Sequence, residues 1–206
     1  IGPPLVVTSA KGQVIKTLAG KPAIDVVHAA ISNLSESLRQ RLLSRGLMIG
    51  RVVNEYKETF GPSDYLIRAV TGVSKDGGEI LTSEEIRVGQ TVRFHVRDSE
   101  AADADLGMLM DAQALHGRPA GMFLVTCNGR GTRLFPHADH DASTLQRAFR
   151  DPDPGEHKAR GGAPIDPAGA RPVPLAGFFG AGEIGPIGDG VFLHGQTACV
   201  AVFREG

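Results

Sequence analysis

A short polar segment follows one of the most apolar stretches of the chain and combines an arginine with two glycines: Cys127, Asn128, Gly129, Arg130 and Gly131. In sheet proteins, ligands tend to collect beyond the carboxyl ends of strands. Glycines allow backbone amides to turn toward an anion, and the guanidinium of Arg130 can hold a carboxylate or phosphate through two parallel hydrogen bonds. The pattern is typical of an anion-binding turn. The alternative is a tight structural turn in which Arg130 pairs with a nearby acid.

A second glycine-rich segment, residues 177–186, carries the carboxylate of Glu183 next to Gly182. Its residues 180–185 match the G-x-G-x-x-G spacing of dinucleotide-binding loops, but that use requires a helix after the glycines and an acidic residue about 20 positions later. A proline follows at once and the later stretch is apolar, so we expect no nucleotide and no other cofactor. Glu183 can instead hold a ligand ammonium across a pocket from Arg130. Alternatively, the two side chains pair with each other.

A third candidate is a group of polar residues at the end of a strand-like run: Arg93, His95, Arg97 and Asp98. These side chains can line the floor of a pocket or face water, which is the commoner outcome for such runs. Arg97 and Asp98 can equally form a structural pair at the corner between a strand and a helix. We retain Arg97 and Asp98, together with the later His194, as candidate ligand-binding residues.

The thiol of Cys127 is the candidate for nucleophilic catalysis. A reactive cysteine needs a nearby cation or a helix N-terminus that lowers its pKa, and Arg130, His95 or His194 can supply the cation. A cysteine at the end of an apolar strand is more often inert core. We therefore expect the chain not to be an enzyme, with Cys127 as the catalytic residue if it is one.

One stretch contains residue types that bind metals: His137, Asp139, His140 and Asp141. Zinc sites use such ligands at characteristic short spacings. The spacing here matches no zinc signature, and His137 follows a proline in a loop-like stretch. We expect no metal site.

The overall composition excludes several functional classes. The 206 residues carry a net charge of −1. A chain so close to neutral lacks the excess of basic residues that is typical of proteins that bind nucleic acids or anionic membranes. No apolar stretch approaches the roughly 20 residues of a membrane span, and the N-terminus is not a signal peptide. The two cysteines fit a reducing compartment. We expect a cytoplasmic protein whose partners include neither nucleic acid nor a membrane.

The spacing of apolar residues changes along the chain from strand-like to helical and back. Helices are expected from Pro22, from Ser35 to Gly46, after Asp98 or Ser99, and over 144–149. The helix after Ser99 has an apolar stripe made of Ala102, Leu106, Leu109 and Met110. Strands are expected at 5–8, 14–18, 47–53, 65–70, 79–81, 91–96, 122–127, 173–179 and 197–203.

This order of elements predicts an α+β fold with mixed, largely antiparallel sheets packed against helices. The strand at 122–127 is uniformly apolar, which favours a central position in its sheet. Residues 151–172 contain five prolines and four glycines and indicate an irregular surface excursion. A glycine-rich turn is expected between the last two strands.

Three separated strings, in order, resemble the C-terminal domain of the FIST family: residues 89–98, residues 127–131, and residues 175–186 followed by Phe192, Leu193 and His194. The opening residues resemble the seam at which a FIST N-terminal domain runs into its C-terminal partner. The chain starts at Ile1 rather than methionine, which suggests an excerpt or a processed product. We predict that 1–20 is the residual end of the N-terminal domain and that 21–206 is the FIST C-terminal domain.

The resemblance implies a sensory module of intracellular signal transduction, bacterial among other sources, that binds a small ligand, with amino acids as the proposed ligands. Its implied partners are the amino-acid-like ligand, the FIST N-terminal half of the same protein, and a signalling protein. In this hypothesis the ligand carboxylate lies on Arg130 and the 127–131 amides, and its ammonium on Glu183. The alternatives are a protein-interaction adaptor and a cysteine-dependent enzyme that uses Cys127.

Overall fold

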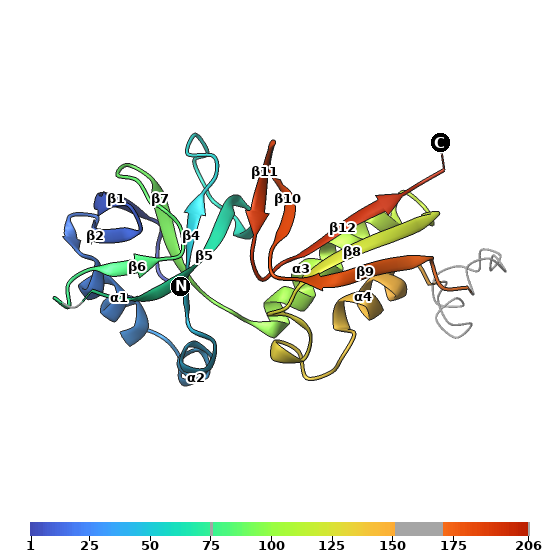
Figure 1. Ribbon diagram of the computed structural model, residues 1–206, viewed down its shortest axis with the longest axis horizontal. Helices are drawn as coiled ribbons and strands as arrows, with labels where there is room; N and C mark the ends of the chain where they lie inside the picture. The colour runs from blue at the N-terminus through green and yellow to red at the C-terminus, as the bar shows by residue number, and fades with distance from the viewer. Residues whose placement is uncertain (75, 151–170, 206) are drawn as a thin grey trace. The chain divides into compact units, whose positions relative to one another are not determined.

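The computed structural model describes residues 1–74, 76–150 and 171–205, which form two compact units (Figure 1). Unit 1 comprises Ile1–Asp98 and Ile184–His194, and unit 2 comprises Ser99–Glu183 and Gly195–Gly206. The excursion expected at 151–172 lies outside the described residues, except for its last two positions.

Unit 1 is built around a closed barrel of six strands, all paired antiparallel. The strand order is β1-β7-β4-β5-β6-β2, and β2 pairs back with β1 to close the ring. The strands are β1 (Leu5–Lys11), β2 (Val14–Leu18), β4 (Leu47–Val52), β5 (Tyr65–Val73), β6 (Ile80–Thr82) and β7 (Thr91–Val96), with the two-residue β3 (Lys21–Pro22) beside β2. Closure leaves few free strand edges, so a small sheet stays stable in water.

The barrel core comes from alternate residues of these strands, as a period of two requires. Ile15, Ile49, Val92 and Phe94 are buried in one apolar cluster, and α1 (Ala23–Ser32) adds Val27 to it. The helix α2 (Glu36–Arg45) follows; Ser35 caps its N-terminus by accepting the amide of Leu38, and Gly46 ends it with a φ of 79°. A short 3-10 turn, η1 (Pro62–Asp64), precedes β5.

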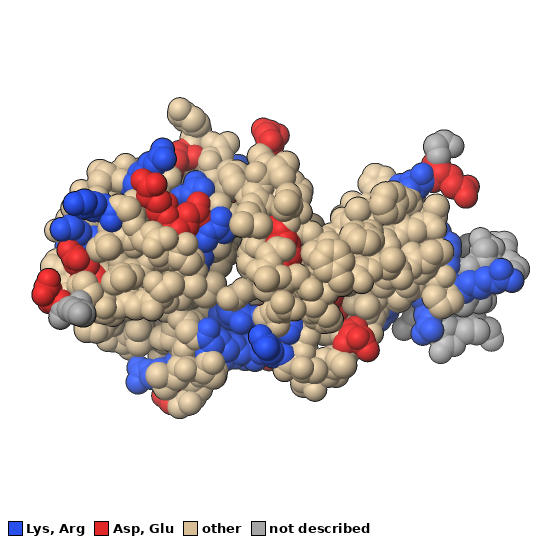
Figure 2. All heavy atoms as spheres, in the orientation of Figure 1, with Lys and Arg blue, Asp and Glu red and all other residues tan. Residues whose placement is uncertain are grey.

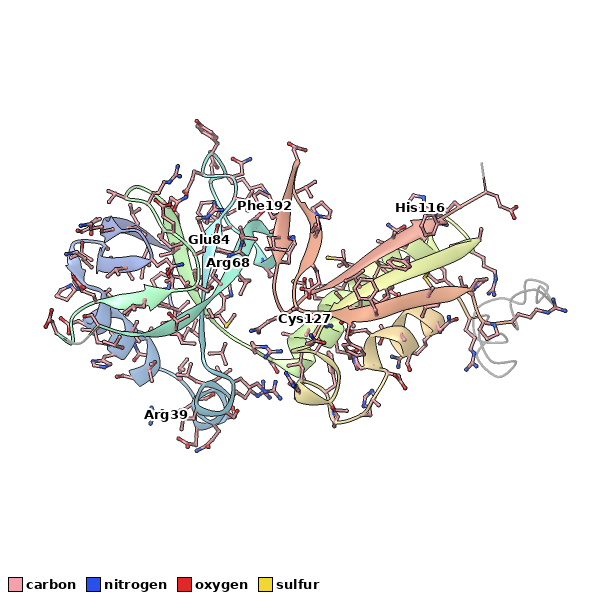
Figure 3. All side chains as sticks on the ribbon, viewed as in Figure 1. Arg39, Arg68, Glu84, His116, Cys127 and Phe192 are labelled. Carbon is pink, nitrogen blue, oxygen red and sulfur yellow. The ribbon has the colours of Figure 1, made fainter. Side chains whose placement is uncertain are left out.

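A hairpin that the sequence analysis did not predict belongs to unit 1. Its strands are β10 (Glu183–Ile187) and β11 (Gly190–His194), in the place where only a glycine-rich turn was expected. Gly188 adopts a φ of 55°, which permits the tight reversal between the strands. Arg68 of β5 donates to the Leu193 carbonyl at 3.0 Å, which ties the hairpin to the barrel, and its guanidinium also pairs with Glu84 (Figure 3).

Unit 2 is a three-stranded sheet with two helices on one face (Figure 1). The strand order is β12-β8-β9, in which β8 (Gly121–Cys127) runs parallel to β9 (Leu175–Gly180) and antiparallel to β12 (Ala198–Phe203). The helices are α3 (Ser99–Ala114) and α4 (His140–Ala148), and a 3-10 turn, η2 (Gly131–Arg133), lies between β8 and α4. The core between the helices and the sheet contains Leu106, Met110, Met122, Leu124, Leu145, Phe149 and Val173.

The predicted α+β class is confirmed, and the strand at 122–127 is indeed central in its sheet. Two local predictions were wrong. Leu109 is 57% exposed, because the buried stripe of α3 runs through Leu106 and Met110. The helix expected over 144–149 starts at His140, because the backbone turns at Asp139, whose φ is 56°. The division between 1–20 and 21–206 stays a prediction, although β1 and β2 pair with later strands.

His95 of β7 is half-buried in unit 1. Its ring contacts the Tyr65 ring edge-on at 5.0 Å, and Gly50 leaves the room for it: a Cβ there would lie 2.7 Å from His95 Nε2. Within the described residues, Nε2 has no hydrogen-bond partner. Burial lowers the pKa of His95 from 6.5 to about 4, and the positive charge of Arg93 acts in the same direction.

We expect acid to destabilise unit 1 through His95. The unfolded chain binds a proton near pH 6.5 that the folded chain binds only near pH 4, so this stabilisation is complete above pH 6.5 and is lost between the two values. The loss should reach up to roughly 3 kcal/mol. Urea unfolding across this pH range measures it, and His95→Gln should flatten the curve. An unchanged pH dependence in the variant would contradict the assignment.

Candidate functional site

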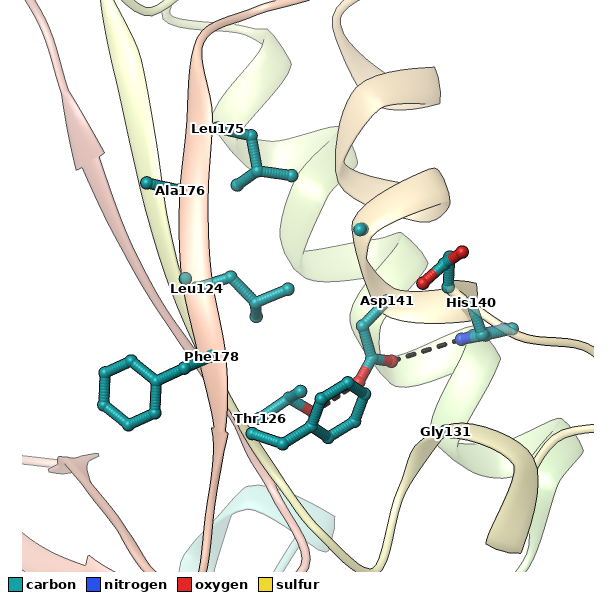
Figure 4. A pocket seen from close by; sticks show the side chains of 12 residues that line it. Leu124, Thr126, Gly131, His140, Asp141, Leu175, Ala176 and Phe178 are labelled. Atoms are coloured by element: carbon teal, nitrogen blue, oxygen red, sulfur yellow. Dashed lines mark hydrogen bonds and ion pairs between the residues drawn. The ribbon is translucent and has the colours of Figure 1, made fainter.

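A cavity of about 260 Å³ opens in unit 2 where β8 and β9 end and α4 begins (Figure 4). Because β8 and β9 are parallel, their carboxyl ends meet at one edge of the sheet, and the first turn of α4 faces that edge. One wall is apolar and the other carries polar groups. The lining residues are Leu124, Thr126, Gly131, Asp139, His140, Asp141, Ala142, Leu175, Ala176, Gly177, Phe178 and Phe179.

Asp141 is the centre of the polar wall. Its Oδ2 accepts hydrogen bonds from Thr126 Oγ1 at 2.6 Å and from Arg130 Nε at 2.8 Å, and its Oδ1 accepts from Arg130 Nη2 at 2.7 Å. Asp141 and Arg130 are both buried, and the guanidinium also lies 5.2 Å from the centre of the Phe135 ring. The pair therefore links the loop after β8 to the first turn of α4.

His140 connects this pair to α3. Its Nδ1 lies 3.2 Å from Asp141 Oδ1 (Figure 4) and its Nε2 lies 2.9 Å from Asp103 Oδ1, while its ring stacks on Phe135. Carboxylate oxygens only accept, so both contacts are hydrogen bonds when the ring carries both N–H groups. Two acidic and two basic groups then balance in charge around the start of α4.

The electrostatics favour the ionised form of Asp141. Burial on its own would raise the pKa of this carboxyl group. The hydrogen bonds from Arg130, Thr126 and His140, with the positive charge of Arg130, outweigh burial and lower the pKa below 3.8. The polar wall therefore holds a fixed carboxylate whose two oxygens are already engaged.

The two glycine-rich segments singled out in the sequence do meet. Asn128 donates its amide to the Gly180 carbonyl at 2.8 Å, and Cys127 is opposite Gly180 in the parallel register. Residues 127–130 form a tight turn closed by the Arg130 amide on the Cys127 carbonyl at 2.8 Å. Gly131 has a φ of 57° and lies against the Phe179 ring.

Arg130 and Glu183 belong to different hydrogen-bond networks, and neither lines the cavity. Arg130 pairs with a local acid, which is the alternative that the sequence left open. Glu183 is buried, and its Oε2 accepts from Thr197 Oγ1 at 2.9 Å and from the Thr197 amide at 3.3 Å. Its Oε1 has no hydrogen-bond partner within the described chain. Gly182 lies in the bend between β9 and β10, also away from the lining.

Cys127 ends β8 as a buried residue (Figure 3). Its Sγ accepts the Gly129 amide at 3.4 Å, which is a contact typical of a turn rather than of an activated thiol. The histidines considered as its partners belong to unit 1, where His95 packs on Tyr65 and His194 Nε2 donates to the Gly185 carbonyl at 2.9 Å.

Arg97 and Asp98 also belong to unit 1. Asp98 forms an ion pair with Arg41 of α2 at 2.7 Å, which links the end of β7 to that helix and fits a structural role. In the described ranges, no three histidine, cysteine or acidic side chains are arranged to hold a metal ion.

The sequence analysis missed the site role of Thr126 and Phe179 and considered Asp139 and Asp141 only as metal ligands. Thr126 was hidden inside a continuous apolar strand. The available signal was an arginine after a strand with an aspartate 11 residues later, which indicates a pair only once α4 is known to fold back.

We expect Asp141→Asn to destabilise unit 2 by roughly 3–5 kcal/mol, because Arg130 is then buried without a counter-charge. Thr126→Val is the matched control: it keeps the shape, removes one hydrogen bond and should cost roughly 1 kcal/mol. Since the pKa of Asp141 is lowered, its stabilisation is present above pH 3.8 and is lost as pH falls further, and the variant should lack that loss. Urea unfolding measures both; equal costs for the two variants would contradict the buried pair.

Comparisons with known proteins place this architecture in a family. The family model described as the FIST C domain matches residues 23–186. Uncharacterized proteins of Mycobacterium tuberculosis strain H37Rv and of Mycobacterium bovis are 42% identical over 207 residues, which cover 100% of this chain and 48% of each relative. The chain thus spans about half the length of the curated relatives it matches.

No solved structure matches the chain. None of the helices in the described part of the chain is long and apolar enough to cross a bilayer. The match over 23–186 covers most of both units, including the cavity and its polar wall. The chain therefore belongs to the FIST C domain family, which implies a sensory domain of signal transduction.

Proposed function

We propose that the cavity of unit 2 is the ligand pocket of this sensory domain, which acts in the cytoplasm, and that its ligand is a small amino-acid-like molecule. The observation that supports this is the joint presence of an apolar wall and fixed polar groups at the carboxyl ends of two parallel strands. Pockets at such strand ends are common binding sites in sheet proteins.

The size of the cavity favours a small ligand. Its volume of about 260 Å³ lies below the roughly 300–1,000 Å³ of pockets for drug-sized molecules. Leu124, Leu175 and Phe179 offer an apolar surface for a side chain of the ligand. The remaining ligand groups would then face the start of α4.

The polar groups suit a zwitterion. The first-turn amides of α4 point toward the cavity end of the helix, where a carboxylate is stabilised by the amides and the helix dipole. Asp139 is exposed, lines the cavity and makes no capping hydrogen bond with its side chain, so its carboxylate can receive an ammonium.

In this arrangement Arg130 does not contact the ligand; it acts by holding Asp141 in position. Its guanidinium already forms two hydrogen bonds to Asp141, so it holds the start of α4 in place. A ligand carboxylate would compete with that pair at a large cost. The proposal therefore moves the ligand away from Arg130 and Glu183 and onto α4 and Asp139.

A thermal-shift panel of amino acids, with the matching acids and amines that lack one charged group, tests the proposal. A ligand present at about 100 times its Kd should add about 2.7 kcal/mol of stability, and the matching single-charge analogues should add less. The Asp139→Asn variant should bind about tenfold more weakly, or worse, with an unchanged melting temperature in the absence of ligand.

The matched control is Asp105→Asn, which removes an exposed carboxylate of α3 that does not line the cavity. It should bind like the wild type. If no compound of the panel raises the melting temperature, or if both variants lose binding equally, the proposal fails.

A further inference from the structure

The face of the unit 2 sheet that α3 and α4 do not cover is entirely apolar. The parallel and antiparallel registers place seven side chains on it: Phe123, Val125, Ala176, Phe178, Cys199, Ala201 and Phe203. We call these seven residues the open face. Figure 4 shows Ala176 and Phe178 pointing away from Leu124 and Leu175, which face the helices.

The open face is exposed in unit 2. Phe178 and Phe203 are each 57% exposed and Phe123 is 39% exposed. The rings of Phe123 and Phe178 meet edge-on at 6.0 Å, so they form one surface rather than isolated spots. Figure 2 shows few charged side chains on the visible surface over these strands.

A sheet covered on one side normally places polar residues on its other side. Here β12 is apolar on both sides and β8 is apolar on both sides apart from Thr126, which is the pattern of strands buried between two layers. Exposed aromatic surface of this kind marks an interface, because leaving it in water costs roughly 25 cal/mol for each Å². The pattern therefore indicates a second covering layer.

We propose that the open face is the docking surface for the other half of the full-length protein. The mycobacterial relatives match this chain along its whole length, yet the match covers only 48% of them, so they contain roughly as many residues again. A segment of that size is large enough to form a domain that covers the sheet. In a polypeptide built like these relatives the two halves are covalently linked, so the effective concentration of one half at the other is high and weak contacts suffice for docking.

This inference is independent of the ligand pocket. The polar wall of the pocket lies toward α4, whereas the open face is on the opposite side of β8 and β9, and only Ala176 and Phe178 of the open face also border the pocket. Ligand binding in the pocket does not require that a second domain cover the open face. Failure of the ligand panel would leave the docking surface untouched, and the reverse also holds.

The experiment uses the full-length protein and measures alkylation of Cys199 by N-ethylmaleimide, followed by peptide mass spectrometry. Cys199 lies on the open face, so the docked half should protect it in the native protein. Phe178→Asp places a charge in the interface and should speed alkylation about tenfold or more. It should also lower the melting temperature by about 3 °C or more.

Leu115→Asp is the matched control, because Leu115 is an 87% exposed apolar residue of unit 2 that lies outside the open face. It should leave both the alkylation rate and the melting temperature unchanged. Cys127 is buried and serves as the internal reference for intact folding of unit 2.

Three outcomes overturn the proposal. Alkylation of Cys199 in the wild type as fast as in the urea-unfolded chain would show that the open face is uncovered. If Phe178→Asp and Leu115→Asp had equal effects on the Cys199 alkylation rate and on the melting temperature, the open face would not be a docking surface. A wild-type dimer by light scattering that Phe178→Asp converts to monomers would assign the face to a second copy.

Discussion

The buried ion pair of Asp141 and Arg130 is the constraint on which the architecture of unit 2 depends. Each charge lies where water cannot solvate it, and removal of either would leave the other uncompensated at a cost of several kcal/mol. The pair can form only when the loop after β8 and the first turn of α4 approach each other. The cavity lies beside this contact, where β8 and β9 meet the start of α4. The hydrogen bond from His140 to Asp103 also holds the start of α4 against α3.

The local elements were predictable because their signals are local. Ser35 and Gly46 bound α2 through a side-chain cap and a positive φ, and the period of two over 91–96 identified β7. The hairpin β10-β11 was missed because its proline and glycines resemble an irregular turn until Arg68, distant in the sequence, holds its backbone. Closure of the barrel was equally hidden, since the pairing of β1 with β7 joins segments more than 80 residues apart.

The meeting of the two glycine-rich segments was predictable, but the hydrogen-bond partners of their charged residues were not. Segments 127–131 and 177–186 meet because parallel strands end at the same edge, and this follows from the order of elements. The partner of Arg130 did not follow, because several acids were available and only the fold of α4 selects Asp141. Burial decides the rest: Glu183 appears exposed in a glycine loop, yet the structure encloses it beside Thr197.

The strand β9 joins the two surfaces to which we assign function. Phe179 lines the cavity and its neighbour Phe178 lies on the open face, so consecutive residues of one strand point to opposite sides. A ligand that displaces the backbone at Phe179 must also move Phe178. Coupling between the sites then requires only that the ligand bind more tightly either when the open face is covered or when it is uncovered. A sensory domain of this design would need no long pathway between its sites, since a single strand carries both the wall of the proposed ligand pocket and the proposed docking contact.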